Sequence, residues 1–274
     1  MFRDHANQSL TMNVLIINLP RHTDRLAFQT SQMDQLGLRY QVVRAIDVNT
    51  VDEHTFQALC DTWERPMRKV EVCCYLSHQT AWEIVKQSGQ PALILEDDAL
   101  LSNQVPALLD ALTQQAFDLV TLEVRGRKKV VSSTRVAITD KLSLLNLYQD
   151  RTGAAGYVLY PSGARKLLEK AAAGHIGITD AFISSHYALN ALQVEPAAII
   201  QLDMCERYGV PAPMQTTSSI GSVERPAAKH AAWRFQLRRI QSQLRMGWRI
   251  LSVWHKAQRR FIALETSHFQ PMQK

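Results

Sequence analysis

Three consecutive acidic residues, Glu96, Asp97 and Asp98, directly follow an apolar run at positions 92–95. Successive side chains of an extended chain point to opposite faces, so Glu96 and Asp98 share one side and Asp97 takes the other. Two carboxylates at the end of a strand suit an octahedral Mg²⁺ or Mn²⁺, which also takes water and phosphate oxygens. A cation would offset the repulsion between the acids. The alternative is a solvated turn with its acids on the surface.

Two arginines follow the first apolar run of the chain, Val14–Leu19. Arg21 and Arg25 lie one helical turn apart, so both can face one ligand if a helix begins there. The forked guanidinium of an Arg at the end of a strand is well placed to bind a phosphate. The plainer alternative is a surface ion pair between Asp24 and an arginine.

A histidine, His78, lies inside the helix-like segment EVCCYLSHQTAWEIV, directly after Ser77. A single His on a helix either takes part in chemistry or makes a structural hydrogen bond, and Trp82 would extend the same face. The four cysteines form no CxxC pair, which predicts neither a zinc site nor a disulfide framework. We therefore expect the protein to work in a reducing compartment.

Alternating strand-like and helix-like segments carry these residues. Short apolar runs predict strands at 14–19, 40–47, 91–98, 117–124 and 154–160. Segments with helical spacing predict helices at 23–36, 52–61, 71–88, 106–115, 161–173 and 179–192. This order is typical of an α/β fold with a mostly parallel central sheet and helices on its faces. Ligands bind such sheets at the carboxyl ends of the strands, where the acids and arginines lie.

The carboxyl-terminal part differs from the rest in charge. Ten of the Lys and Arg residues lie between Arg225 and Arg260, where there is no Asp or Glu. An apolar stripe at helical spacing runs through this segment, formed by Trp233, Leu237, Ile240, Leu244, Trp248, Leu251 and Trp254. A basic helix with Trp and Leu on one face is typical of an interfacial membrane helix. The alternatives are packing on the body or on a second subunit, and non-specific binding of nucleic acid, for which no recognition motif is present.

We favour the membrane, and expect Trp233, Arg238, Arg245 and Trp248 to meet an anionic lipid surface. The sequence shows neither a secretory signal nor an apolar stretch near the roughly 20 residues that cross a bilayer. Both observations predict a soluble or peripherally attached intracellular protein. We expect a catalytic domain at 1–222 and a basic amphipathic helical tail at 223–274.

The ordered set of motifs resembles glycosyltransferase family 25, the bacterial lipopolysaccharide and lipooligosaccharide glycosyltransferases related to collagen galactosyltransferases. The motifs are INLPRHTDR, EVCCYLSHQTAWEIV, ALILEDDALL, TGAAGYVLYPSGARKLLEKA and ITDAF, and they cover about residues 13–200. One departure is Cys73, which stands where the family usually has Gly. That change bears on local helix packing more than on chemistry.

The resemblance implies a GT-A-like nucleotide-sugar-binding fold and the transfer of a hexose, often galactose from UDP-galactose, with inversion. It implies that the acidic motif holds Mn²⁺ or Mg²⁺ through Asp98, with Glu96 assisting. A cation across two phosphates would neutralise the leaving nucleoside diphosphate. The residues expected to bind the nucleotide sugar are Asn18, Arg21, Arg25, Ser77, His78, Asp97 and Gly153.

Inversion needs one general base on the acceptor hydroxyl. Asp180 opens a predicted helix after Gly174 and Gly177, and the family has an Asp at this place. The roles of base, acceptor-binding residue and helix cap are all open for it. Glu123, at another strand end, is the rival base, and His186 is a further candidate that is better explained as structural.

We therefore expect an inverting, metal-dependent glycosyltransferase on the cytoplasmic face of a bacterial inner membrane, acting on a lipooligosaccharide or related surface glycan. One rival is a non-catalytic protein that uses the same α/β scaffold and basic helix to bind a membrane or a partner. A second rival is a nucleotidyltransferase, which would normally carry a phosphate-cradling glycine-rich loop after the first strand. Residues 18–25 contain no Gly.

Overall fold

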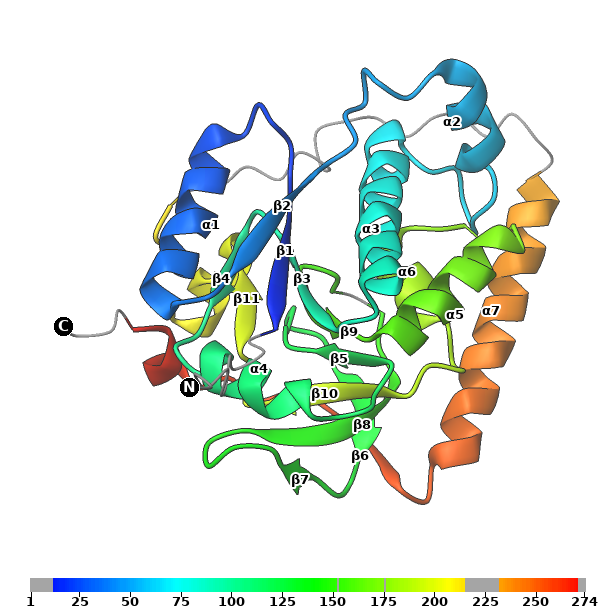
Figure 1. Cartoon of the computed structure of the whole chain (residues 1–274). Coiled ribbons are helices and arrows are strands. Elements are labelled where there is room, and N and C mark those ends of the chain that lie inside the picture. Colours follow the sequence, from blue (N-terminus) through cyan, green and yellow to red (C-terminus); the bar gives the residue numbers. More distant parts are fainter. Residues whose placement is uncertain (1–11, 152, 175, 215–231, 271–274) are drawn as a thin grey trace, which may run out of the picture.

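The computed structural model describes residues 12–151, 153–174, 176–214 and 232–270, which form a mixed α/β fold (Figure 1). The strands are β1 (Asn13–Asn18), β2 (Tyr40–Arg44), β3 (Ala92–Glu96), β4 (Ala99–Leu101), β5 (Leu119–Thr121), β6 (Lys129–Ser132), β7 (Val136–Ala137), β8 (Ser143–Gln149), β9 (Gly156–Leu159), β10 (Ala191–Glu195), β11 (Ile199–Gln201) and β12 (Ala257–Arg260). The helices are α1 (Thr23–Leu36), α2 (Glu53–Cys60), α3 (Lys69–Ser88), α4 (Val105–Thr113), α5 (Pro161–Ala172), α6 (Thr179–Ser184) and α7 (Ala232–Val253).

One large sheet carries most of the strands, in the order β12-β6-β8-β10-β5-β9-β3-β1-β2, with β7 paired to β8. At one edge β1 runs parallel to both β2 and β3, and Ile16 lies opposite Val42 on one side and Leu95 on the other. β1 is buried along nearly its whole length, as the continuous apolar run predicts. The carboxyl ends of β1 and β3 therefore lie side by side.

Beyond β3 the sheet is more mixed than the sequence predicts. β9 runs antiparallel between β3 and β5, and β10 is parallel to β5 but antiparallel to β8. β6 and β12 continue the antiparallel pattern to the far edge. The expectation of a mostly parallel sheet holds at the β2–β1–β3 edge and is wrong across the other half. Short apolar runs do not encode strand direction, which depends on how the connections return.

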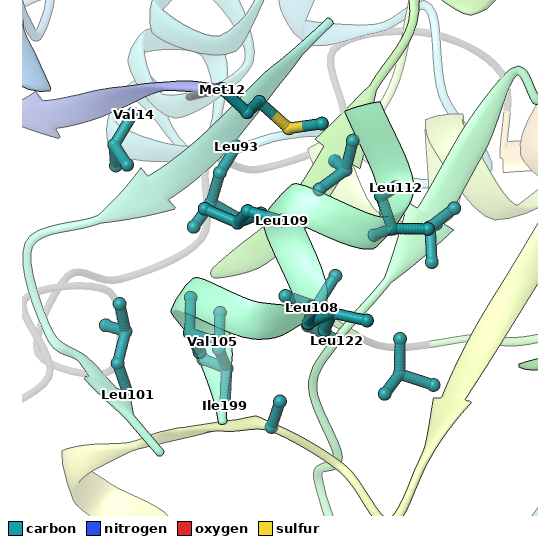
Figure 2. Close-up of a cluster of buried hydrophobic side chains, with 14 of the residues drawn as sticks. Met12, Val14, Leu93, Leu101, Val105, Leu108, Leu109, Leu112, Leu122 and Ile199 are labelled. Carbon is teal, nitrogen blue, oxygen red and sulfur yellow. The ribbon is translucent and has the colours of Figure 1, made fainter. Parts of the chain in front are cut away.

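Two hydrophobic clusters cover the two faces of the sheet. On one face α1 and α4 pack against β1, β3 and β5, and Figure 2 shows Leu108, Leu109 and Leu112 of α4 beside Leu93 and Leu122. On the other face α3, α5 and α6 pack around Trp82, Tyr157 and Phe182. Cys73, which departs from the family pattern, is buried in a third cluster that joins α2 to α3. Its side chain therefore fills space in a core.

The predicted helix at 179–192 is wrong over most of its length. α6 ends at Ser184, a turn follows, and residues 191–195 form β10 in the centre of the sheet. His186 accordingly lies in the turn and not on a helix. The segment also contains the apolar alternation of a strand, and pairing with β5 and β8 gives that strand a buried place that a longer helix would not have.

Helix α7 lies along one side of the molecule (Figure 1), and it contacts β8. Its buried residues include Phe235 and Val253, whereas Trp248 is 74% exposed and Leu244 60% exposed. The helix ends at Val253, inside the basic segment Arg225–Arg260, and β12 then pairs with β6 of the main sheet. The tail thus contains a strand as well as a helix. None of the described helices is long and apolar enough to cross a membrane.

Candidate active site

A cleft of about 360 Å³ opens at the carboxyl ends of β1, β2 and β3. Its floor carries the acidic motif, and the lining includes Arg21, His22, Arg25, Cys74, Ser77, His78, Glu96, Asp97, Asp98, Arg125, Gln201 and Asp203. Apolar side chains from the ends of β1 and β2, among them Leu19 and Ile46, form another wall. A planar, partly apolar ligand that carries negative charge fits this combination of surfaces.

Glu96 and Asp98 lie on the same side of the chain, as the strand geometry predicts. The Gln201 side-chain amide bridges them, because its Nε2 lies 3.3 Å from Glu96 Oε2 and 3.3 Å from Asp98 Oδ1. The Gln201 Oε1 atom is buried and has no hydrogen-bond partner among the described residues. Burial and the neighbouring charges of Glu96 and Asp97 raise the pKa of Asp98 to about 7. The side-chain nitrogen of Gln201, and not its oxygen, therefore faces the two carboxylates.

Asp97 points away from this group and is enclosed by partners. Its Oδ2 accepts a hydrogen bond from Asn18 Nδ2 at 2.9 Å, and its Oδ1 accepts one from Arg25 Nη1 at 3.0 Å. His22 Nδ1 lies 3.6 Å from the same carboxylate. Asp97 thus fixes the β1–α1 turn against β3. Arg25 and Asp97 line the cleft, while Asn18 supports it from behind.

Arg21 is paired with Asp47, which follows β2, whereas the alternative that the sequence left open was a pair between Asp24 and an arginine. Its guanidinium is half exposed and lines the cleft. Ser77 accepts a hydrogen bond from the Ile46 backbone N–H at 2.8 Å and donates one to the Cys73 carbonyl at 2.7 Å. Ser77 therefore ties α3 to the segment after β2.

His78 is fully buried beneath Glu96 in a chain of hydrogen bonds. Its Nε2 lies 3.2 Å from Glu96 Oε1, and its Nδ1 lies 2.9 Å from the Tyr157 hydroxyl. Trp82 donates its indole N–H to the same hydroxyl at 2.7 Å. Because Tyr157 accepts from Trp82, its own proton is available for His78 Nδ1, which leaves the His78 Nε2 proton for Glu96. Burial acts to raise the pKa of Glu96, but the His78 hydrogen bond holds it below its ordinary value.

A second cavity of about 240 Å³ continues from the cleft, and both share Cys74, Glu96, Arg125 and Gln201 in their linings. Asp180 and Gly153 line this second cavity and not the first. The Asp180 Oδ1 accepts a hydrogen bond from the Ala181 backbone N–H at 2.7 Å, and burial raises its pKa. A weakly acidic carboxyl group facing a cavity is suited to accept a proton there.

Glu123 is fully buried and is not among the residues that line the two cavities. Its Oε1 accepts a hydrogen bond from the Ala155 N–H at 3.0 Å, and burial raises its pKa to about 8. Gly153 has φ +109°, and a Cβ there would lie 2.2 Å from Glu123 Oε1. The geometry favours Glu123 as a support for the 153–155 loop over a role as base.

A third and much smaller cavity lies beyond Asp180, beneath α7. Gly153 and Asp180 line it as well as the second cavity, and its lining also includes Tyr148, Tyr187 and Arg249. The Arg249 guanidinium lies over both tyrosine rings at 5.6 Å. His186 also lines this cavity, so it lies near Asp180 although α6 ends before it, at Ser184.

The exposed stripe of α7 faces away from the body. Trp233 is 55% exposed and Arg245 is also exposed. Arg238 was predicted to meet a lipid surface, but it donates hydrogen bonds to the backbone carbonyls of Trp63, at 3.0 Å, and Asp61. Arg238 therefore anchors the helix to the body and is not turned toward solvent with the stripe.

Sequence reasoning missed Arg125, Gln201 and Cys74. Arg125 directly follows the strand-like run 117–124, and its Nη2 lies 2.7 Å from Asp203 Oδ2 at the rim of the cleft. Its place after a strand was a usable signal. Gln201 is brought to the acids by the pairing of β11 with β4, a long-range contact that no local pattern indicates.

Comparisons with known proteins bear on this site. The model of a family described as glycosyltransferase family 25 (LPS biosynthesis protein) matches residues 11–182. Human procollagen galactosyltransferase 2 is 24% identical over 189 residues, which cover 64% of this chain and 30% of that protein. The lacto-N-neotetraose biosynthesis glycosyltransferase LgtE of Neisseria meningitidis is 27% identical over 167 residues, which cover 57% of this chain and 59% of that protein.

Some relatives carry names that say they are inactive. The rat probable inactive glycosyltransferase 25 family member 3 is 31% identical over 171 residues, which cover 57% of this chain and 29% of that protein. The alignments thus span less than a third of the animal relatives. Among solved structures, the inositol-1-phosphate CTP transferase of T. maritima matches with a TM-score of 0.36 at 10% identity, over 69% of each chain.

Proposed function

Because the chain belongs to glycosyltransferase family 25, we propose that it transfers a hexose from a nucleotide sugar to a glycan acceptor. One observation carries this proposal: Glu96, Asp98 and Gln201 converge on the floor of a cleft that also holds Arg21 and Arg125. Acids and arginines together match a ligand that combines a diphosphate with a cation. UDP-galactose is the donor that we propose, since relatives of this chain are named as galactosyltransferases.

The residues on the cleft floor fit a divalent cation. Glu96 and Asp98 offer carboxylate oxygens of the kind that Mg²⁺ and Mn²⁺ prefer. A half-turn of the Gln201 amide would add its Oε1 atom, which lacks a partner among the described residues. Repulsion between the two carboxylates would be relieved by such an ion. When bound, the ion would supply charge neutralisation for the departing nucleoside diphosphate. We propose Mn²⁺ or Mg²⁺ as the cofactor.

The chain's own groups have separate tasks in the proposed reaction. Arg21 and Arg125 would bind the diphosphate oxygens through charge-assisted hydrogen bonds. His78 keeps Glu96 oriented and ionised, as its 3.2 Å contact with that carboxylate supports. Asp180 would accept the proton of the acceptor hydroxyl as that oxygen attacks the anomeric carbon, which gives inversion in a single displacement. Its place in the second cavity, which continues from the cleft, supports an acceptor site beside the donor.

We further propose that α7 binds an anionic membrane and that the acceptor is a lipooligosaccharide or a related surface glycan. The exposed Trp and Leu stripe supports this proposal, as does the lack of acids from Arg225 to Arg260. A bacterial relative named for lacto-N-neotetraose biosynthesis supports the class of acceptor. The proposed location is the cytoplasmic face of a bacterial inner membrane, where nucleotide sugars and lipid-linked acceptors meet.

The experiment that tests the transferase is a donor screen on the purified protein. Release of nucleoside diphosphate would be followed from a panel of nucleotide sugars, with Mn²⁺, with Mg²⁺ and with a chelator. We expect slow, metal-dependent turnover of UDP-galactose, lost in Asp98→Asn by roughly 100-fold or more. Asp24→Asn is the matched control, because Asp24 is an exposed acid of α1 outside the cleft lining. No turnover of any donor by folded protein would defeat the proposal.

The inactive names among the relatives favour one alternative, a non-catalytic protein on the same scaffold. Such a protein could retain donor binding without turnover. Titration of UDP-galactose and Mn²⁺ into the protein, followed by calorimetry, separates the two. Binding together with turnover supports the enzyme, whereas binding without turnover in the presence of glycan acceptors supports the alternative.

A further inference from the structure

Three chemically different metal-binding side chains meet at the junction of the two cavities. Cys74, His78 and Glu96 each offer one ligand atom, and these atoms all lie within 4.8 Å of one another. Cys74 and His78 are one helical turn apart on α3, so they face the same side, and Glu96 ends the neighbouring strand β3. The absence of a CxxC pair hid this group from sequence reasoning.

The distances are close to those of a tetrahedral metal site. His78 Nε2 lies 3.2 Å and Cys74 Sγ lies 3.9 Å from the same atom, Glu96 Oε1. Ligand atoms at about 2.0–2.3 Å from Zn²⁺ lie roughly 3.3–3.7 Å apart in a tetrahedron. The nitrogen and oxygen already have that separation, and a small rotation of Cys74 would bring its sulfur in.

The side chains behind His78 also fit a metal ligand. A metal-bound His is usually held by a hydrogen bond from its second ring nitrogen. His78 Nδ1 lies 2.9 Å from the Tyr157 hydroxyl, which Trp82 orients from the other side. For Nε2 to bind a metal, the His78 proton must move from Nε2 to Nδ1, which then donates to the Tyr157 oxygen while Tyr157 turns its own proton away. The fully buried rings of Trp82 and Tyr157 hold this geometry in place.

We propose that Cys74, His78 and Glu96 form a Zn²⁺ site whose occupation inhibits the protein. Thiolate and imidazole ligands select Zn²⁺ over Mg²⁺ and Mn²⁺, which prefer oxygen. The Cys74 thiol releases its proton to solvent as the sulfur–zinc bond forms. The fourth ligand position faces the cavities, which Cys74 and Glu96 both line, and a water molecule can occupy it.

Inhibition follows from the sharing of Glu96. The carboxylate that completes the thiol site is the one that, with Asp98, forms the oxygen site proposed for Mn²⁺ or Mg²⁺. A zinc ion bound through Glu96 Oε1 would compete for that carboxylate and place a second positive charge close to the oxygen site. It would also lie in the passage that joins the two cavities. The inhibition rests on the proposed transferase function, whereas the binding of zinc does not.

Binding is tested with Co²⁺, which reports thiolate ligation by a charge-transfer absorption band. We expect the wild-type protein to develop this band, Zn²⁺ to abolish it by displacement, and Cys74→Ser and Cys74→Ala to lack it. Cys60→Ser is the matched control, because Cys60 is a buried thiol of α2 in a different cluster. Circular dichroism would establish that each variant is folded. A band that is absent from wild type, or that survives in both Cys74 variants, would overturn the proposal.

Inhibition is tested separately by titrating Zn²⁺ into the UDP-galactose turnover assay in excess Mn²⁺. Each variant is compared with its own zinc-free rate, so a lower basal rate does not matter. We expect Cys74→Ser to need about tenfold or more zinc for half-inhibition than wild type and Cys60→Ser. Equal sensitivity of all three would overturn inhibition through this site. Absence of turnover would defeat the transferase proposal, while the cobalt spectrum would still decide whether the site exists.

Discussion

At the scale of single residues, the surroundings of Asp98 suit ligand binding better than they suit the stability of the fold. It is enclosed beside Glu96 and Asp97, and like charges and burial together raise its pKa. Replacement of its carboxylate by an amide of the same shape removes a repulsive charge and keeps the packing. If the proposed cation binds there, the site exchanges stability of the metal-free protein for that binding, a pattern common at functional sites.

The first prediction concerns Asp98→Asn without metal. We expect its thermal unfolding midpoint to be higher than that of wild type, because one unfavourable buried charge is gone. Addition of Mn²⁺ should raise the midpoint of wild type and leave that of Asp98→Asn nearly unchanged. Differential scanning calorimetry with and without Mn²⁺ measures both effects. Asp24→Asn should behave as wild type, and equal stabilisation of Asp98→Asn by Mn²⁺ would count against a metal role for Asp98.

A second prediction concerns Gly153, whose φ of +109° is a backbone conformation that residues with a side chain rarely adopt. Gly153→Ala should destabilise the fold by about 1–3 kcal/mol, because the new methyl meets Glu123 as well as straining the backbone. Gly89→Ala is the matched control, since Gly89 also has positive φ but nothing lies within 4 Å of its added Cβ. Urea unfolding compares the two. A cost for Gly153→Ala no greater than for Gly89→Ala would show that Glu123 is not a rigid neighbour.

At the scale of elements, the sequence patterns predicted those helices and strands whose structure depends on residues nearby in the chain. The helix at 23–36 coincides with α1, whose end Gly37 marks in the left-handed conformation. The acids at the carboxyl end of β3 lie on the sides of the chain where strand alternation puts them. The sequence did not predict β10, because its short apolar run continues an apparently helical segment. Only the pairing with β5 and β8 makes this run a strand. Gln201 was missed for the same reason, since its position comes from the pairing of β11 with β4, a contact distant in sequence.

The third prediction concerns the strand that returns after α7. Arg260 Nη2 of β12 lies 2.7 Å from Glu195 Oε2 of β10, and the Ala263 N–H donates to the same carboxylate. Burial acts to raise the pKa of Glu195, but Arg260 holds it below its ordinary value. The carboxylate thus contributes stability above about pH 4.5 that is lost as the pH falls through the lowered folded-state pKa.

Arg260→Gln should therefore lower the free energy of unfolding by about 1–3 kcal/mol at neutral pH. The difference from wild type should shrink as the pH falls through the folded-state pKa of Glu195, because the protonated carboxyl no longer gains from the guanidinium. Urea unfolding across the acid range measures this. Arg259→Gln, at the neighbouring exposed position of β12, should track wild type. A constant difference at every pH would refute the electrostatic account.

At the scale of the whole molecule, α7 is joined to the body at both ends of its length. Arg238 fastens it near Trp63, and β12 then pairs with β6. The predicted division at 222 stays a prediction, but the segment after α7 contributes a strand to the sheet of the body. The stripe is thus presented by a helix that the body holds in a fixed orientation.

The fourth prediction follows from that orientation. The protein should co-float with vesicles rich in anionic lipid, and the binding should weaken with added salt. The double variant Leu244→Ser and Trp248→Ser should lower binding by about tenfold or more, since two large apolar groups no longer enter the interface. Val136→Ser is the matched control, because Val136 is 70% exposed on β7 away from the stripe. Concentration-dependent dimerisation without vesicle binding would instead assign the stripe to a second copy.

The third cavity connects the candidate site with α7, since both Asp180 and Arg249 of α7 line it. If α7 rests on a bilayer, the proposed base lies just behind the lipid-facing surface, and enzyme and acceptor diffuse within one plane. Encounter would then depend on how many acceptors occupy each unit of membrane area and not on their number per unit volume. Diluting the acceptor with inert lipid should slow turnover even when the total amounts of enzyme and acceptor stay the same.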